Sequence, residues 1–129
     1  MNTLTDAELI NRIADLMEQG SQGRRQITGQ YFEIDGRGVC AMGACLTAVG
    51  VKPQPCDNIN LKEALEIKEW PKVMYPSETF YWTWIHNVRD PVYLDDAIVS
   101  LNDAGGWDFA HIIQWLRDVA SGMTTAESR

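Results

Sequence analysis

The chain is poor in the features that would place it in a membrane or on a nucleic acid. No apolar run among its 129 residues is long enough to cross a bilayer, and no basic segment followed by an apolar stretch marks a secretory signal. Lysine and arginine number only 11, against 18 aspartates and glutamates, which gives a net charge of −7. A protein that binds the phosphate groups of a nucleic acid needs a basic patch on its surface. We therefore expect no direct nucleic-acid binding, no membrane association and a cytoplasmic location.

Cysteine and histidine are also scarce. The three cysteines are Cys40, Cys45 and Cys56, and the two histidines, His86 and His111, stand far apart in the sequence. An odd cysteine count without a secretory signal predicts free thiols. Zinc sites use closely paired ligands, which these spacings do not provide, so we expect no metal ion. A glycine-rich phosphate loop is missing as well, and we predict no cofactor.

The residues that are present predict a compact, mainly α single domain of about five helices, with room for one small β-hairpin. Apolar positions recur at helical spacing, and capping residues and glycines mark the helix ends. The domain is expected to span residues 1–122 and to be followed by a flexible tail at 123–129. The predicted helices cover residues 6–20, 40–49, 61–69, 94–101 and 108–122.

Local patterns support these boundaries unevenly. Thr5 and Glu8 form a capping box for the first helix. Residues 40–49 are apolar all round and rich in small side chains, which predicts a buried central helix that other elements approach closely. Residues 30–34 favour a strand, and the Asp-Gly pair that follows favours a hairpin turn. The aromatic stretch at 76–91 fits either a strand or a helix, and its helical neighbourhood favours a helix.

Two segments carry a resemblance. Residues 38–44 read G-x-C-A-x-G-A, and residues 98–116 read I-x-x-L-N-D-x-G-G-W-x-F-x-x-I-x-x-W-L. Together they resemble a family of small uncharacterised proteins of bacteria and their phages, in which a Trp-Asn-Asp block precedes the last helix. Here Leu101 stands where that family often has tryptophan, and residues 51–96 have no counterpart. The resemblance implies a fold and a phage or mobile-element origin, and no catalytic residues.

Cys40 is the residue most open to a catalytic interpretation. It opens a helix, and the helix dipole lowers the pKa of a thiol at that position. His111 as base, with Asn102 or Asp103 to orient it, would complete the plan of a papain-like cysteine hydrolase or transferase. His111, however, falls on the polar face of the last helix. A small buried apolar thiol is therefore the preferred interpretation, and we expect no enzyme.

Acidic residues favour a different function. Residues 90–116 contain five aspartates and no lysine or arginine. One explanation of such a run is a solvated face that keeps the protein soluble. The other is a surface that binds a basic partner, to which the five tryptophans would add contacts. The residues that we expect to bind the partner are Asp95, Asp96, Asp103, Asp108, His111 and Trp115.

We therefore predict a non-enzymatic acidic phage or mobile-element protein that binds and blocks a host protein with a basic surface. A bacterial defence complex, inhibited in the manner of an anti-CRISPR protein, is such a host target, and the site of action is then the host cytoplasm. Two alternatives stay open. One is the cysteine enzyme built on Cys40. The other is a homodimeric structural protein that buries the aromatic cluster at residues 80–85.

Overall fold

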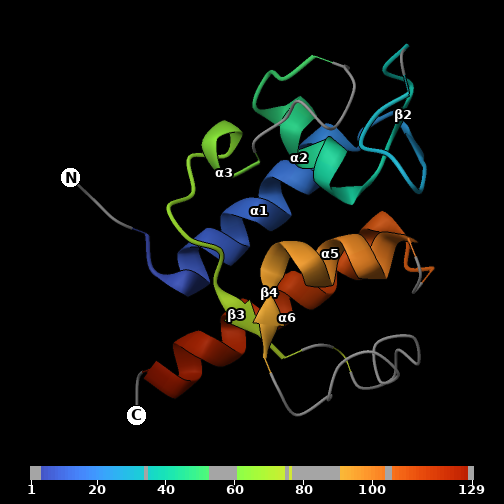
Figure 1. Ribbon diagram of the computed structural model, residues 1–129. Coiled ribbons are helices and arrows are strands. Elements are labelled where there is room, and N and C mark those ends of the chain that lie inside the picture. Colours follow the sequence, from blue (N-terminus) through green and yellow to red (C-terminus); the bar gives the residue numbers. More distant parts are fainter. Residues whose placement is uncertain are drawn as a thin grey trace.

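The computed structural model describes residues 4–33, 35–52, 61–74, 76, 91–103 and 106–127, and only the backbone of residues 124–127. This part of the chain is compact and mainly α, as predicted, with two short strand pairs (Figure 1). The helices are α1 (Asp6–Gly20), α2 (Ala41–Ala48), α3 (Leu61–Ala64), α5 (Leu94–Asp103) and α6 (Phe109–Glu127). The strands are β1 (Arg25–Gln26), β2 (Gly38–Val39), β3 (Lys72–Val73) and β4 (Val92–Tyr93).

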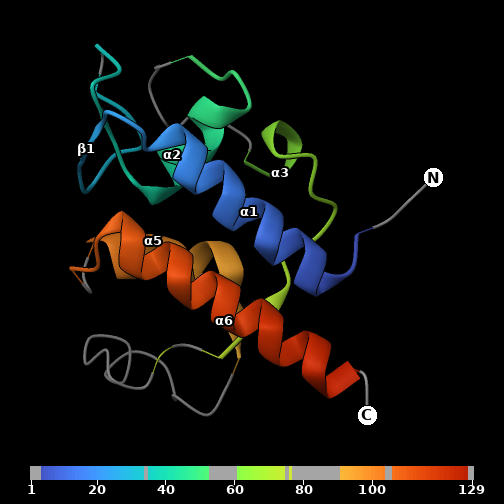
Figure 2. The same cartoon turned by 180° about the vertical axis from the view of Figure 1, so that it is seen from behind.

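α1 begins and ends where the sequence predicts. Thr5 Oγ1 accepts a bond from the Glu8 amide at 3.1 Å, and Glu8 Oε1 accepts one from the Thr5 amide at 2.9 Å, which completes the capping box. Ile10, Ile13 and Met17 are fully buried along the inner side of the helix. α1 packs against both α2 and α6, so it forms the middle of the molecule (Figure 2).

α2 is the buried central helix that its composition predicts. Its residues from Ala41 to Leu46 are all buried, and Cys40 caps its N-terminus. The small residues allow close packing of backbone on backbone. A Cβ on Gly43 would overlap the Tyr31 carbonyl oxygen, and a Cβ on Gly20 would overlap the Ala44 carbonyl oxygen. Larger residues at these two positions would push α2 away from its neighbours.

The predicted ends of two helices are wrong. The helix expected at 61–69 stops at Ala64, because Glu66 takes a left-handed φ of 58° and the Ile67 amide turns back to the Lys62 carbonyl at 2.7 Å. The last helix does not end at Gly122 but continues to Glu127. One glycine costs a helix only about 1 kcal/mol. The packing of α6 on α1 outweighs that cost.

The remaining elements agree with their predictions in part. α5 covers the helix expected at 94–101 and runs on to Asp103. The hairpin expected around residues 30–36 reduces to a single antiparallel bridge between Phe32 and Val39, while β2 pairs in parallel with β1. β3 pairs antiparallel with β4, and β4 leads directly into α5. The helix expected at 76–91 and the aromatic cluster at 80–85 lie outside the described residues, except for the prolines at the two ends.

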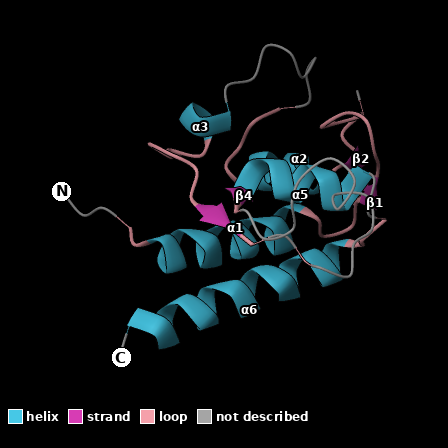
Figure 3. Ribbon diagram, turned by 60° about the horizontal axis from the view of Figure 1, so that its bottom comes forward, coloured by secondary structure: helices cyan, strands magenta, loops and turns pink. Residues whose placement is uncertain are grey.

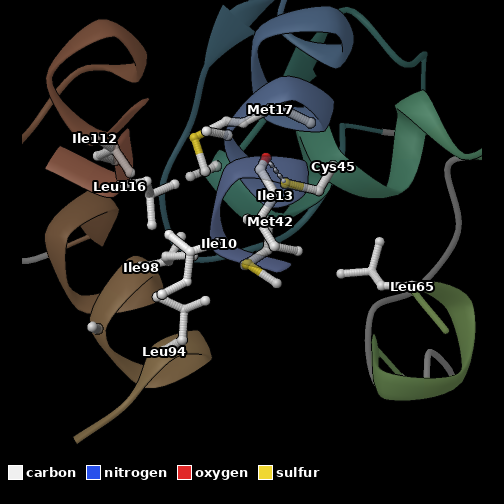
Figure 4. Packing of buried hydrophobic residues seen from close by; sticks show 14 of the residues in the cluster. Ile10, Ile13, Met17, Met42, Cys45, Leu65, Leu94, Ile98, Ile112 and Leu116 are labelled. Atoms are coloured by element: carbon white, nitrogen blue, oxygen red, sulfur yellow. Dashed lines mark hydrogen bonds between the residues drawn. The ribbon is translucent and has the colours of Figure 1, made fainter. Parts of the chain in front are cut away.

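One core joins all the major helices. Figure 3 shows α1 between α6 on one side and α2 on the other, and α5 packs on both α2 and α6. Cys45 donates its thiol proton to the Ile13 carbonyl at 3.6 Å within this core (Figure 4). No helix in the described ranges combines the length and apolarity that a membrane crossing requires. The side chains that meet in Figure 4 include Ile10, Ile13, Met17, Met42, Leu65, Leu94, Ile98, Ile112 and Leu116.

Candidate binding site

Asn102 lies at the junction of three segments that are distant in the sequence. Its side chain is only 2% exposed. The Oδ1 atom accepts bonds from the Ala41 amide at 3.0 Å and from Gln26 Nε2 at 2.8 Å. The Nδ2 group donates to the Ile27 carbonyl and to Asp103 Oδ1, both at 2.8 Å. All the donors and acceptors of the amide group are therefore used, and Asn102 ties α5 to the start of α2 and to the loop after β1.

Gln26 extends this network to α6. Its Nε2 group also donates to the Trp107 carbonyl at 2.7 Å, and its Oε1 atom accepts from the Phe109 amide at 2.9 Å. The first turn of a helix has amides without partners inside the helix, so Gln26 supplies one of the missing acceptors for α6. Asn102 and Gln26 together hold the ends of α2, α5 and α6 in a fixed relation.

A pocket of about 350 Å³ opens beside this network. It lies between the loop at 29–31, the first turn of α2 and the outer side of α5, and one carboxylate stands among otherwise neutral residues. The residues that line it are Gly29, Gln30, Tyr31, Cys40, Met42, Val99, Asn102 and Asp103.

Cys40 forms part of the pocket wall, yet its thiol is not activated. Its Sγ accepts from the Gly43 amide at 3.3 Å, as an N-cap side chain does. Burial raises the pKa of the thiol to about 11, and the negative charge of Asp103 adds to this, although the helix amides oppose it. The expected lowering of the pKa by the helix dipole is thus outweighed by desolvation. At neutral pH the thiol stays protonated and is a poor nucleophile.

His111 does not join Cys40. It is exposed on the first turn of α6, where its Nδ1 lies 3.2 Å from Asp108 Oδ1 and its ring packs 5.7 Å from that of Trp107. It is not among the residues around the pocket. Asp108 caps the start of α6, because its Oδ1 accepts from the His111 amide at 2.8 Å, and that bond lowers the pKa of the carboxyl.

Asp103 does join Cys40, at the edge of the pocket. It is exposed, and its Oδ1 accepts bonds from the Gly29 amide at 3.3 Å and from Asn102 Nδ2. Asp96 is exposed two helical turns earlier, and Val99 stands between the two on the same face of α5. Asp95 is half-buried next to Asp96. Desolvation is the first cause that raises the pKa of its carboxyl, and the charge of Asp96 adds to it.

The exposed carboxylates of Asp96, Asp103 and Asp108 form what we call the acidic face. Within the described residues, no lysine or arginine nitrogen lies within ion-pair distance of these three groups. Arg117, further along α6, pairs instead with Asp15 at 2.9 Å and Glu18 at 3.0 Å on α1. Apart from His111, which lies 3.2 Å from Asp108 and is charged only when protonated, the described part of the protein therefore pairs no cation with the acidic face.

The arginines around β1 and β2 are engaged elsewhere. Arg24 donates to the carbonyls of Gly20, Gln22 and Gly36. Arg25 pairs with Glu33, and Arg37 approaches Asp35 at 3.9 Å. These three arginines therefore interact with groups of their own region and do not pair with Asp103.

Trp115 is the aromatic residue expected at the partner surface, and it is only partly exposed. It packs against the core at the edge of the α6 stripe formed by Ile112 and Leu116. Its ring can contribute a rim contact, but part of its surface is already used within the fold.

The two segments that carry the sequence resemblance meet at this site. The Ala41 amide belongs to the first and Asn102 to the second, and the hydrogen bond between them spans 61 positions of the chain. Sequence reasoning singled out Cys40 and Asp103 but missed the roles of Gln26, Met42 and Val99. A lone glutamine in a loop carries no sequence signal, whereas the helical spacing of Asp96, Val99 and Asp103 could have revealed their common face.

No family model, no curated protein and no solved structure matches this chain. Among the described residues no group of three or more histidine, cysteine, aspartate or glutamate side chains is arranged to hold a metal ion.

Proposed function

We propose that the protein is a non-enzymatic binding protein that attaches through its acidic face to a basic surface of another protein and blocks that surface. The observation that carries this proposal is that Asp96, Asp103 and Asp108 are exposed and that no lysine or arginine in the described part of the chain pairs with them. Aligned charges of one sign steer a partner of opposite charge and speed association.

The chemistry of Cys40 supports the same choice over the enzyme alternative. A thiol enzyme needs a thiolate and a base near it. Cys40 has a pKa raised to about 11, and its sulfur serves as the cap of α2. His111 lies outside the pocket and pairs with Asp108. These features favour a structural thiol.

The kind of partner follows from the charge and from the resemblance. The resemblance to small proteins of bacteria and phages makes a host protein the partner that we propose. The acidic face would complement a basic surface that itself binds nucleic acid. The groove of a bacterial defence nuclease complex is such a surface. By covering that groove, an acidic protein excludes the nucleic acid.

The test is a pull-down from bacterial host lysate with the tagged chain, eluted in salt steps and analysed by mass spectrometry. The expected result is one stoichiometric partner released by moderate salt, because screening shortens the range of exposed charges from roughly 8 Å at physiological ionic strength to roughly 3 Å at 1 M. The proposal further predicts that Asp96→Lys abolishes capture of that partner.

The matched control is Glu69→Lys, which makes the same charge change at an exposed position on another part of the molecule. It should leave the capture intact. The same partner retained by Asp96→Lys, or lost equally with Glu69→Lys, would contradict the role of the acidic face. In a parallel arm, Cys40→Ser should keep the capture, since serine is a favoured cap residue.

A further inference from the structure

We propose that the pocket beside Asp103 receives a lysine or arginine side chain of the protein partner, with the cation on the Asp103 carboxylate and the alkyl stem against Val99 and the Tyr31 ring. This inference rests on the proposed function and extends it, because it names the group of the partner that is recognised. The site is the cavity of about 350 Å³ between the loop at 29–31, α2 and α5.

The one charged group of the pocket favours a ligand that donates hydrogen bonds. The amide of Asn102 is fully used within the protein. The Asp103 Oδ1 atom accepts its two bonds from Gly29 and Asn102, and no described residue donates to Oδ2. The pocket therefore presents an acceptor with negative charge. Lysine and arginine are the side chains that carry donors and no acceptor.

The apolar part of the pocket fits the rest of such a side chain. Val99 and the Tyr31 ring, both partly exposed, provide apolar surface in the pocket. Lysine and arginine bury their alkyl stems on surfaces of this kind while the charged head stays near water. Asp103 is exposed, so the head group would keep its contact with solvent.

The cavity is large enough to receive one long side chain. Its volume lies at the lower end of the roughly 300–1,000 Å³ usual for small-molecule sites. A single anchor that enters a pocket at an otherwise flat interface is typical of binding hot spots, among which arginine is enriched. Asp96, on the same face of α5, would meet further basic residues around that anchor.

The direct test uses Nα-acetyl-arginine methylamide, its lysine counterpart and its neutral citrulline counterpart as probes. Each is titrated into the full ¹⁵N-labelled chain and followed by NMR. The expected result is saturable shifts at the amides of Gly29, Val99 and Asp103 with both cations and none with citrulline. Asp103→Asn keeps an acceptor for Gly29 but removes the charge, so it should weaken binding about tenfold. Glu69→Gln should change nothing.

Three results would overturn the proposal. One is the absence of saturable shifts at these three amides at tens of millimolar cation. The second is equal binding of the citrulline probe, which would mean that the pocket recognises a neutral group. The third is an unchanged affinity in the Asp103→Asn variant with its spectrum otherwise preserved.

A pair of pocket variants separates this inference from the proposed function. Val99→Phe fills the pocket, and Val99→Ala leaves it open, so only the first should block the cation probes and reduce partner capture. Thermal unfolding of both variants shows whether they fold. If Val99→Phe captures the partner normally while Asp96→Lys does not, the acidic face binds without an anchor and only the pocket proposal fails. If neither change affects capture, the proposed function fails.

Discussion

Asn102 is the residue whose removal should cost the fold most for its size. In an Asn102→Ala variant, four hydrogen bonds disappear together. The most serious loss is at Ala41, which is fully buried and whose amide has Asn102 Oδ1 as its acceptor. The Ile27 carbonyl loses its bond from Asn102 as well. Gln26 keeps its bonds to Trp107 and Phe109, so its loss is partial.

The magnitude follows from these partners. A buried amide left unsatisfied costs about 1–3 kcal/mol, and each of the other bonds contributes about 0.5–1.5 kcal/mol. The free energy of unfolding should therefore fall by about 3–5 kcal/mol, a large part of the roughly 5–15 kcal/mol that a domain has in total. For a chain of this length each kcal/mol shifts Tm by about 4 °C, so Tm should drop by roughly 10–20 °C.

The assay is urea unfolding followed by circular dichroism, with Gln114→Ala as the control. Gln114 makes one exposed bond to Asp118 at 2.9 Å, and its loss should change stability by no more than about 0.5 kcal/mol. A second variant, Asn102→Asp, keeps the acceptor for Ala41 but cannot donate to Ile27 while ionised, and it places a second negative charge beside Asp103. It should be unstable at neutral pH and regain stability on acidification. If Asn102→Ala loses less than about 1 kcal/mol, the reasoning about this network is refuted.

Three further predictions concern single residues. Peptide-mapped alkylation with iodoacetamide at neutral pH should label Cys40 about 100-fold more slowly than an ordinary thiol, since burial raises its pKa from 9.0 to about 11; equal rates would contradict the burial of this thiol. Gly43→Ala should destabilise the protein by about 1–3 kcal/mol in thermal melts because the Tyr31 carbonyl blocks the new methyl group, whereas Gly122→Ala, in open space on α6, should stabilise it by about 0.5–1 kcal/mol; the opposite order would exclude the close approach. Asp95→Asn should raise stability at pH 7 by up to about 0.5 kcal/mol, discounted for exposure. The raised pKa of Asp95 means that its ionisation opposes folding, so this gain should vanish as the pH falls below the ordinary aspartate pKa; a gain that does not depend on pH would contradict the assignment.

The candidate site was predictable in part. Cys40 and Asp103 stand out in the sequence because one opens an apolar helix and the other belongs to an acidic stretch without basic residues. The hydrogen bond from the Ala41 amide to Asn102 could not be predicted from local sequence patterns, because it joins residues 61 positions apart. Asn102 is buried, and its bond from the Ala41 amide makes its side chain a connection between helices.

The sequence by itself determined the helical class, the start of α1, the burial of α2 and the inner stripe of α6. These properties depend on spacing along the chain and on capping residues, which act over three or four positions. Only the tertiary structure decided that Asp103 lies beside Cys40 while His111 lies apart from it, and that desolvation outweighs the helix dipole at the thiol. Those outcomes depend on which elements pack against each other, because burial and the distances between charges exist only once the helices have come together.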